Sequence, residues 1–137
     1  MFRTLLIAAV SLTVTTLACA GPTMEKNGML RDGSGKTLYV FAKDQIGKSN
    51  CTGACIATWP AFVAKPEAQA NGDLTLVVRD DGSKQWALKG QPLYYFVGDA
   101  TAGDAKGDGM GGTWRVVRTG SLPAPAAATI ATPTSYY

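Results

Sequence analysis

The chain has 137 residues, of which 46% are hydrophobic, and a formal net charge of +3 at pH 7. This length is enough for one domain with a single modest core. Lys and Arg are spread among Asp residues without a basic run or stripe, so the charge pattern excludes nucleic acid as an expected partner. The sequence contains no histidine, which removes Ser/His and Cys/His nucleophilic machinery and most zinc hydrolysis.

Residues 1–20 have the features of a signal peptide. Arg3 supplies the positive charge, an apolar stretch runs from Leu5 to Leu17, and Ala18-Cys19-Ala20 fits a cleavage site of the A-x-A type. We therefore expect export, with the mature protein in the periplasm or secreted. Lipid anchoring at Cys19 is the alternative. No segment of the mature chain is long and apolar enough to be expected to span a membrane.

The rest of the chain divides into three parts. We expect a short N-terminal linker at 21–27, a folded domain at 28–118 and a tail at 119–137. The tail is rich in Pro, Ala and Thr and carries no charge. Such a composition buries too little apolar surface to offset the entropy of ordering, so the tail is predicted to be disordered.

The domain at 28–118 contains an internal duplication. The segment from Leu38 to Asp44 is repeated as Leu93 to Asp99, and Thr58-Trp59 is repeated as Thr113-Trp114, all at one offset of 55 residues. Bulky identities kept in register indicate a duplicated structural unit. We expect the two copies to span about 28–64 and 84–118.

The expected elements of the domain are short β-strands. In chain order they fall at 28–30, 36–41, 58–64, 74–78, 84–88, 93–97 and 113–118, with at most a helical turn at 52–58. Gly- and Asp-rich turns separate them, and no 3.6-residue periodicity is sustained. The sequence therefore predicts a small all-β domain of two pseudo-equivalent β units with Gly-rich loops.

Cys51 and Cys55 remain as an even pair once Cys19 is removed with the leader. In an oxidising compartment we expect them to form one local disulfide. The alternative is a redox or copper-handling site, because thiolates are soft ligands. Met110 would join Cys51 and Cys55 in that weak alternative, since the repeat places it opposite Cys55. Apart from this alternative, no metal and no cofactor are expected.

The duplicated aromatic motif is the other candidate site. Its members are Tyr39, Phe41, Asp44 and Trp59 in the first copy and Tyr94, Phe96, Asp99 and Trp114 in the second. In a strand, the Tyr and Phe of one copy lie on the same face. We interpret the motif as structural: buried rings, bonded hydroxyls, and Asp carboxylates that accept backbone N–H groups of the following loop. The alternative is a shallow aromatic cleft for a sugar, a quinone or a peptide.

The pattern Tyr-x-aromatic-x-x-Asp, present twice and followed in the first copy by Cys51-x-x-x-Cys55 and Trp59-Pro60, resembles a known family. This is the bacterial secreted-repeat family described as predicted lipoproteins with a Yx(FWY)xxD motif, and the resemblance covers about Gly28 to Arg118. It implies an exported, often lipid-anchored protein of tandem copies whose biochemical function is not established. We therefore expect a non-enzymatic binding or interaction module of the cell envelope, with no catalytic residues. Its partner would be an unknown envelope component or a small ligand.

Overall fold

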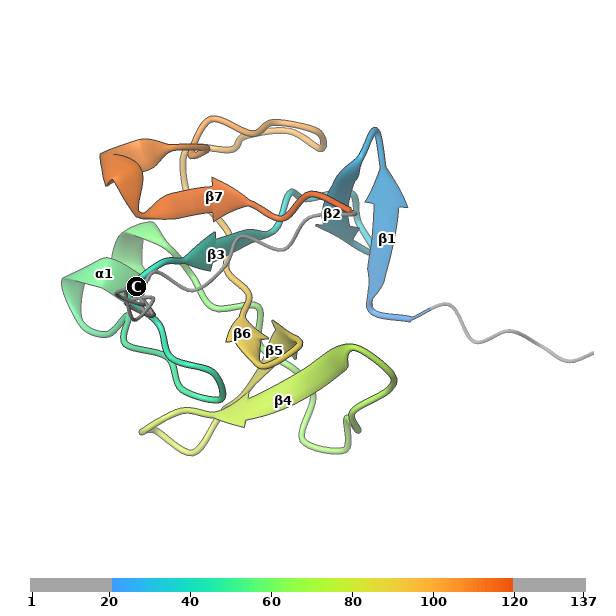
Figure 1. Ribbon diagram of the computed structural model, residues 1–137, viewed down its shortest axis with the longest axis vertical. Helices are drawn as coiled ribbons and strands as arrows, with labels where there is room; N and C mark the ends of the chain where they lie inside the picture. The colour runs from blue at the N-terminus through green and yellow to red at the C-terminus, as the bar shows by residue number, and fades with distance from the viewer. Residues whose placement is uncertain (1–20, 120–137) are drawn as a thin grey trace, which may run out of the picture.

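The computed structural model describes residues 21–119, so the expected signal peptide at 1–20 and the expected tail beyond Thr119 lie outside the described residues. The strands are β1 (Thr23–Lys26), β2 (Met29–Asp32), β3 (Tyr39–Phe41), β4 (Leu74–Val78), β5 (Lys84–Leu88), β6 (Gln91–Pro92) and β7 (Trp114–Val116) (Figure 1). One short helix, α1 (Ala54–Thr58), and one 3-10 turn, η1 (Met110–Gly112), accompany them. The expected all-β class is confirmed.

β1 lies within 21–27, the segment that we expected to be a linker. It pairs antiparallel with β2, from Thr23 opposite Asp32 to Lys26 opposite Met29, and the hairpin stands at one end of the molecule (Figure 1). Asn27 and Gly28 connect the strands with φ angles of 55° and 73°. Asn-Gly favours tight hairpin turns with two positive φ angles. The folded part therefore begins before residue 28.

The second hairpin is formed by β4 and β5, and β6 continues it into a three-stranded antiparallel sheet. β4 and β5 have the bounds that their β-branched and aromatic residues predict. The strand expected at 93–97 does not form as a continuous strand: β6 covers Gln91–Pro92, just before it, and within 93–97 Tyr94 forms isolated bridges. The strand expected at 58–64 is likewise present as isolated bridges, from Ala61 to Tyr94 and from Val63 to Gln85.

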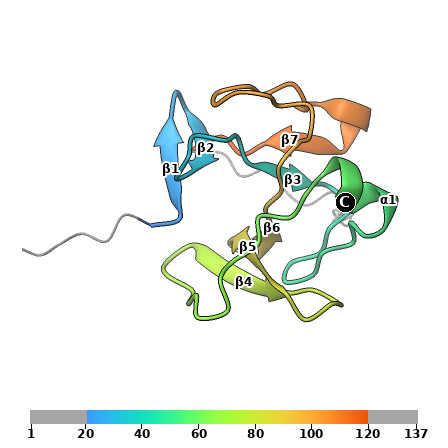
Figure 2. The same ribbon diagram turned by 180° about the vertical axis from the view of Figure 1, so that it is seen from behind.

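The last strand of each copy pairs with the other copy. β7 pairs antiparallel with β3, and the two strands lie side by side in both views (Figure 2). Val117 N donates to Leu38 O at 3.0 Å, and Phe62 N donates to Leu93 O at 2.9 Å, which is the same contact moved by one repeat. The two copies therefore exchange their final strands.

A reciprocal backbone pair joins the copies at their centre. Tyr39 N donates to Tyr94 O and Tyr94 N donates to Tyr39 O, both at 2.9 Å. A contact between a residue and its own counterpart is what a twofold relation produces. The two repeat units expected from the sequence are therefore present, arranged about an approximate twofold axis beside these tyrosines.

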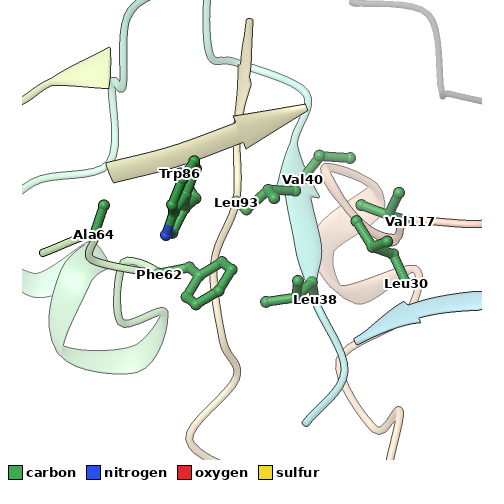
Figure 3. Close-up of a cluster of buried hydrophobic side chains, with 8 residues drawn as sticks. All are labelled: Leu30, Leu38, Val40, Phe62, Ala64, Trp86, Leu93 and Val117. Atoms are coloured by element: carbon green, nitrogen blue, oxygen red, sulfur yellow. The ribbon is translucent and has the colours of Figure 1, made fainter. Parts of the chain in front are cut away.

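The core has an aliphatic part and an aromatic part. The aliphatic part also holds two aromatic rings and consists of Leu30, Leu38, Val40, Phe62, Ala64, Trp86, Leu93 and Val117 (Figure 3). In Figure 3, Trp86 comes from β5, and Phe62 comes from the segment after α1. The aromatic part is centred on Tyr39, Trp59, Tyr94 and Trp114. Both parts draw residues from both copies, so neither copy has a core of its own.

Candidate functional site

The duplicated motif forms a stack of four rings in the aromatic core. Its order is Phe41, Trp114, Trp59 and Phe96, with successive centroids 4.3, 3.9 and 4.5 Å apart. The two copies alternate along the stack, and the two tryptophans at its centre are nearly parallel, at 4°. Such contacts stabilise a core by about 0.5–1.5 kcal/mol per pair beyond burial of the ring areas.

The two motif tyrosines close this stack from its sides. Tyr39 meets Trp59 edge-on at 5.3 Å, and Tyr94 meets Trp114 edge-on at 5.2 Å. Both tyrosines are 0% exposed. Their rings therefore offer no face to a ligand in this conformation.

The hydroxyl of each motif tyrosine donates a hydrogen bond to the motif aspartate of the other copy. Tyr39 Oη lies 2.6 Å from Asp99 Oδ2, and Tyr94 Oη lies 2.6 Å from Asp44 Oδ2. Burial, followed by the facing carboxylate, raises the pKa of both phenols above the ordinary value of 10.0. Both hydroxyls therefore remain protonated donors at neutral pH.

The other oxygen of each aspartate holds the loop that follows it. Asp44 Oδ1 accepts the backbone N–H of Asn50 at 2.6 Å, and Asp99 Oδ1 accepts that of Lys106 at 2.9 Å. Each carboxylate thus joins its own loop to the tyrosine of the other copy. We expected each aspartate to hold its own loop, but its bond to the tyrosine of the other copy was not predicted.

The surroundings of the two carboxylates differ. Ser49 Oγ lies 2.6 Å from Tyr94 Oη and accepts a hydrogen bond from Arg79, which also donates to Gln85 and to the carbonyl of Cys51. Burial raises the pKa of Asp44, although hydrogen bonds from Asn50 and Tyr94 and the charge of Arg79 offset part of the increase. The Tyr39 hydroxyl instead accepts the N–H of Gly107 at 3.2 Å.

Cys51 and Cys55 form the expected disulfide. Cys51 is fully buried beside the aromatic core, and Cys55 is partly buried against it. Because both sulfurs are bonded to each other, neither presents a thiolate to a metal. Met110 is 42% exposed. Within residues 21–119, no cluster of three or more His, Cys, Asp or Glu side chains has the geometry of a metal site.

A cavity of about 320 Å³ lies away from the motif, between the end of β2, the middle of β5 and the segment after α1. Its walls are mainly apolar and come from Pro22, Phe62, Val63, Ala68 and Trp86. Asp32, Lys65 and Glu67 supply its charges. No binding role was predicted for this region from the sequence.

Asp32 is the buried charge of the cavity, with 9% of its surface exposed. Its Oδ1 accepts hydrogen bonds from the backbone N–H groups of Ser34 and Lys36 and from the Ser34 hydroxyl, and its Oδ2 accepts one from Tyr95. Burial acts to raise the pKa of Asp32, but these hydrogen bonds outweigh it and hold the pKa below the usual 3.8. Asp32 is therefore ionised at neutral pH.

A signal for this cavity exists where the two copies differ. At the repeat offset, Asp32 corresponds to Ala87, and Trp86 corresponds to Arg31. Such positions do not recur, so the repeat does not indicate them. The cavity residues were therefore not predicted from the sequence.

The fold and the motif define a small all-β protein in which two homologous copies share one aromatic core. Residues 23–63 and 75–118 match the family described as a secreted repeat of unknown function. The two matches together span more than half of the chain, which therefore belongs to this family. They begin before residues 28 and 84, where we expected the copies to start, and so include β1 and all of β4 except its first residue.

No curated protein and no solved structure matches the chain. Among residues 21–119, no helix has the length and hydrophobicity needed to cross a membrane.

Proposed function

We propose that this protein is a non-enzymatic binding module of the cell envelope that takes a small ligand in the cavity beside Phe62 and Trp86. The observation that carries the proposal is the cavity itself. Its volume of about 320 Å³ falls within the range of small-molecule sites, which combine apolar walls with a few polar groups.

The duplicated motif has a structural role in this proposal. Its tyrosines are buried, its hydroxyls are bonded to aspartates, and its tryptophans are stacked on each other. A ligand could reach these rings only by separating the copies. Scaffold and site are then different sets of residues, as in many binding proteins.

The proposal includes a place in the cell and a role for the disulfide. Membership of a secreted family and the leader-like residues 1–20 support a periplasmic or secreted protein, with lipid anchoring at Cys19 as the alternative. The Cys51–Cys55 bond would brace the loop around α1. The partner would be a small molecule or an envelope component that presents a small group.

The three tryptophans allow a direct test of the binding site. We would titrate the ¹⁵N-labelled protein with indole, phenol, cyclohexanol and 2-phenylethanol, and follow the three indole N–H signals. The proposal predicts a saturable shift at Trp86 with at least one probe, while Trp59 and Trp114 stay unchanged. Shifts confined to Trp59 and Trp114, or no saturable shift with any probe, would contradict it.

A pair of variants separates the cavity from other surfaces. Ala68→Leu places a larger side chain in the cavity wall and should abolish the Trp86 shift. Ala57→Leu makes the same change on the exposed surface of α1 and should leave the shift intact. Equal binding by both variants would place the ligand elsewhere.

A further inference from the structure

The charge in the cavity wall indicates which ligands the cavity prefers. Asp32 and Glu67 are acidic and Lys65 is basic, so the lining carries one net negative charge. Lys65 and Glu67 are exposed, whereas Asp32 is buried. The charge that a bound molecule meets away from bulk water is therefore that of Asp32.

The carboxylate of Asp32 is held in place but not neutralised. Within residues 21–119, no Lys or Arg nitrogen forms an ion pair with it. Oδ1 receives three hydrogen bonds, whereas Oδ2 receives a single one, from Tyr95 Oη at 2.8 Å. A carboxylate oxygen can accept two, so Oδ2 retains an acceptor position.

The residues around Asp32 preserve its negative charge. Burial, followed by the neighbouring Asp32, raises the pKa of Tyr95, so this phenol stays protonated and donates to the carboxylate. The Lys36 ammonium lies over the Tyr95 ring, 5.6 Å from its centroid, and makes no ion pair with Asp32 in the described residues. Oδ2 has one donor and no ion pair, so an ammonium that reaches it adds a charged hydrogen bond without displacing another cation.

We propose that the cavity selects small organic cations, such as a primary amine attached to an apolar or aromatic group, with Asp32 as the residue that determines the charge preference. The apolar group would lie against Phe62 and Trp86, and the ammonium would donate to Asp32 Oδ2. This inference rests on the proposed function, because it specifies the ligand of that same cavity.

Three probes of similar shape and different charge test the inference on the unmodified protein: 2-phenylethylamine, 2-phenylethanol and 3-phenylpropanoate. Dissociation constants come from the shift of the Trp86 indole signal. We expect the amine to bind about tenfold more tightly than the alcohol, the size of one charged hydrogen bond, and the carboxylate to bind most weakly. Equal affinities for the amine and the alcohol would overturn the inference and leave the proposed function standing.

Two matched variants assign the preference to Asp32. Asp32 and Asp81 each begin an Asp-Gly-Ser segment, and each accepts the N–H and the hydroxyl of the serine two residues further on. Asp81 is exposed and does not line the cavity. Asp32→Asn should bring the affinities for the amine and the alcohol within about twofold of each other, whereas Asp81→Asn should leave the tenfold preference unchanged.

Each result of this experiment decides something. An amine preference that survives in Asp32→Asn overturns the role of Asp32. If Asp32→Asn does not fold, the three probes on the unmodified protein still decide whether cations are preferred. If none of these probes and none of the neutral probes above shifts Trp86, the proposed function fails, and the inference fails with it.

Discussion

At the scale of single residues, the repeated aspartates and tyrosines act across the copies. Each Asp accepts a hydrogen bond from a tyrosine hydroxyl with one oxygen and a hydrogen bond from a loop N–H with the other. A buried hydrogen bond to a charged group contributes about 1.5–3 kcal/mol, and an unsatisfied donor costs a similar amount. These residues stand out in the sequence because they recur, but their partners in the other copy appear only in the folded structure.

Gly107 is a second residue with a specific packing role. A Cβ at this position would lie 2.6 Å from Trp59 Cη2 and 3.0 Å from Phe96 Cγ. These rings are stacked and cannot move independently of the core. The backbone of Gly107 therefore occupies space that a side chain would take from the aromatic stack.

We predict that Gly107→Ala lowers the free energy of unfolding by about 1–3 kcal/mol, as overpacking of a tight core does. Urea denaturation followed by tryptophan fluorescence measures this change. Gly33→Ala is the control, because no atom lies within 4 Å of a Cβ there, and its effect should stay within about 0.5 kcal/mol. Equal stability of the two variants would show that the stack yields to the extra methyl group.

At the scale of elements, α1 depends on contacts outside itself. It has only five residues, none of them buried, and no side chain caps it. So short a helix is not stable alone in water. The Cys51–Cys55 bond and the hydrogen bond from Arg79 to the carbonyl of Cys51 fix the loop from which it begins.

We predict that the double substitution Cys51→Ser, Cys55→Ser leaves the protein folded but less stable by about 2 kcal/mol, the low end of the usual range, because the closed loop is short. The amide signals of Ala54–Thr58 should lose protection from hydrogen exchange, while those of Tyr39 and Tyr94 keep it. Reduction of the unmodified protein should reproduce this pattern. Loss of protection at Tyr39 as well would assign the bond a global role.

The strands show why a sequence predicts where strands lie better than which strands pair with each other. β-branched residues and the Asp-Gly turn between the strands correctly indicated β4 and β5, whereas the Asn27-Gly28 turn of the first hairpin was not predicted. The pairing of β7 with β3 was not predicted. Because the two copies are alike, a final strand finds the same apolar surface and the same hydrogen-bonding groups in either copy, so the hydrophobic pattern cannot distinguish them.

At the scale of the whole molecule, exchange of strands makes the two copies one cooperative unit. Both parts of the core contain residues from both copies, and Tyr39 and Tyr94 join the copies through their backbones and their hydroxyls. Unfolding one copy would expose the core of the other. We therefore expect a single unfolding transition.

The buried phenols give this transition a dependence on alkaline pH. Their pKa is raised in the folded protein, so above about pH 10 the unfolded chain loses protons that the folded protein keeps. Below this pH, ionisation of Tyr39 and Tyr94 should leave the free energy of unfolding unchanged, because both phenols are protonated in the folded and the unfolded chain. Above it, the two together should lower the free energy by about 2.7 kcal/mol per pH unit.

Urea denaturation curves test this expectation. We would measure them from pH 8 to pH 11, at intervals of about 0.5 pH unit. The double substitution Tyr39→Phe, Tyr94→Phe is the comparison, because it keeps Tyr95 and all lysines. It should be less stable at pH 8 but show a smaller decrease above pH 10. Parallel curves for the two proteins would mean that the phenols ionise in the folded state.

The position of the cavity could not be predicted from the sequence for a similar reason. Pro22, Trp86 and the segment that contains Phe62 and Ala68 are far apart in the chain, and all four are ordinary core or loop residues by type. Only the exchange of strands brings the segment after α1 against β5 and beside the end of β2. The repeat therefore predicted the scaffold, and the differences between its copies form the candidate site.

The central claim is that the repeated motif joins the two copies, and a double-mutant cycle tests it most directly. We would measure the free energy of unfolding for Tyr39→Phe, Asp99→Ala, Asp44→Ala and the two pairs that contain Tyr39→Phe. Each single Asp substitution should cost about 1–3 kcal/mol. We predict a coupling energy of about 1 kcal/mol or more between Tyr39 and Asp99, and less than about 0.5 kcal/mol between Tyr39 and Asp44 of its own copy. The reverse result, or no coupling in either pair, would contradict the exchange between copies.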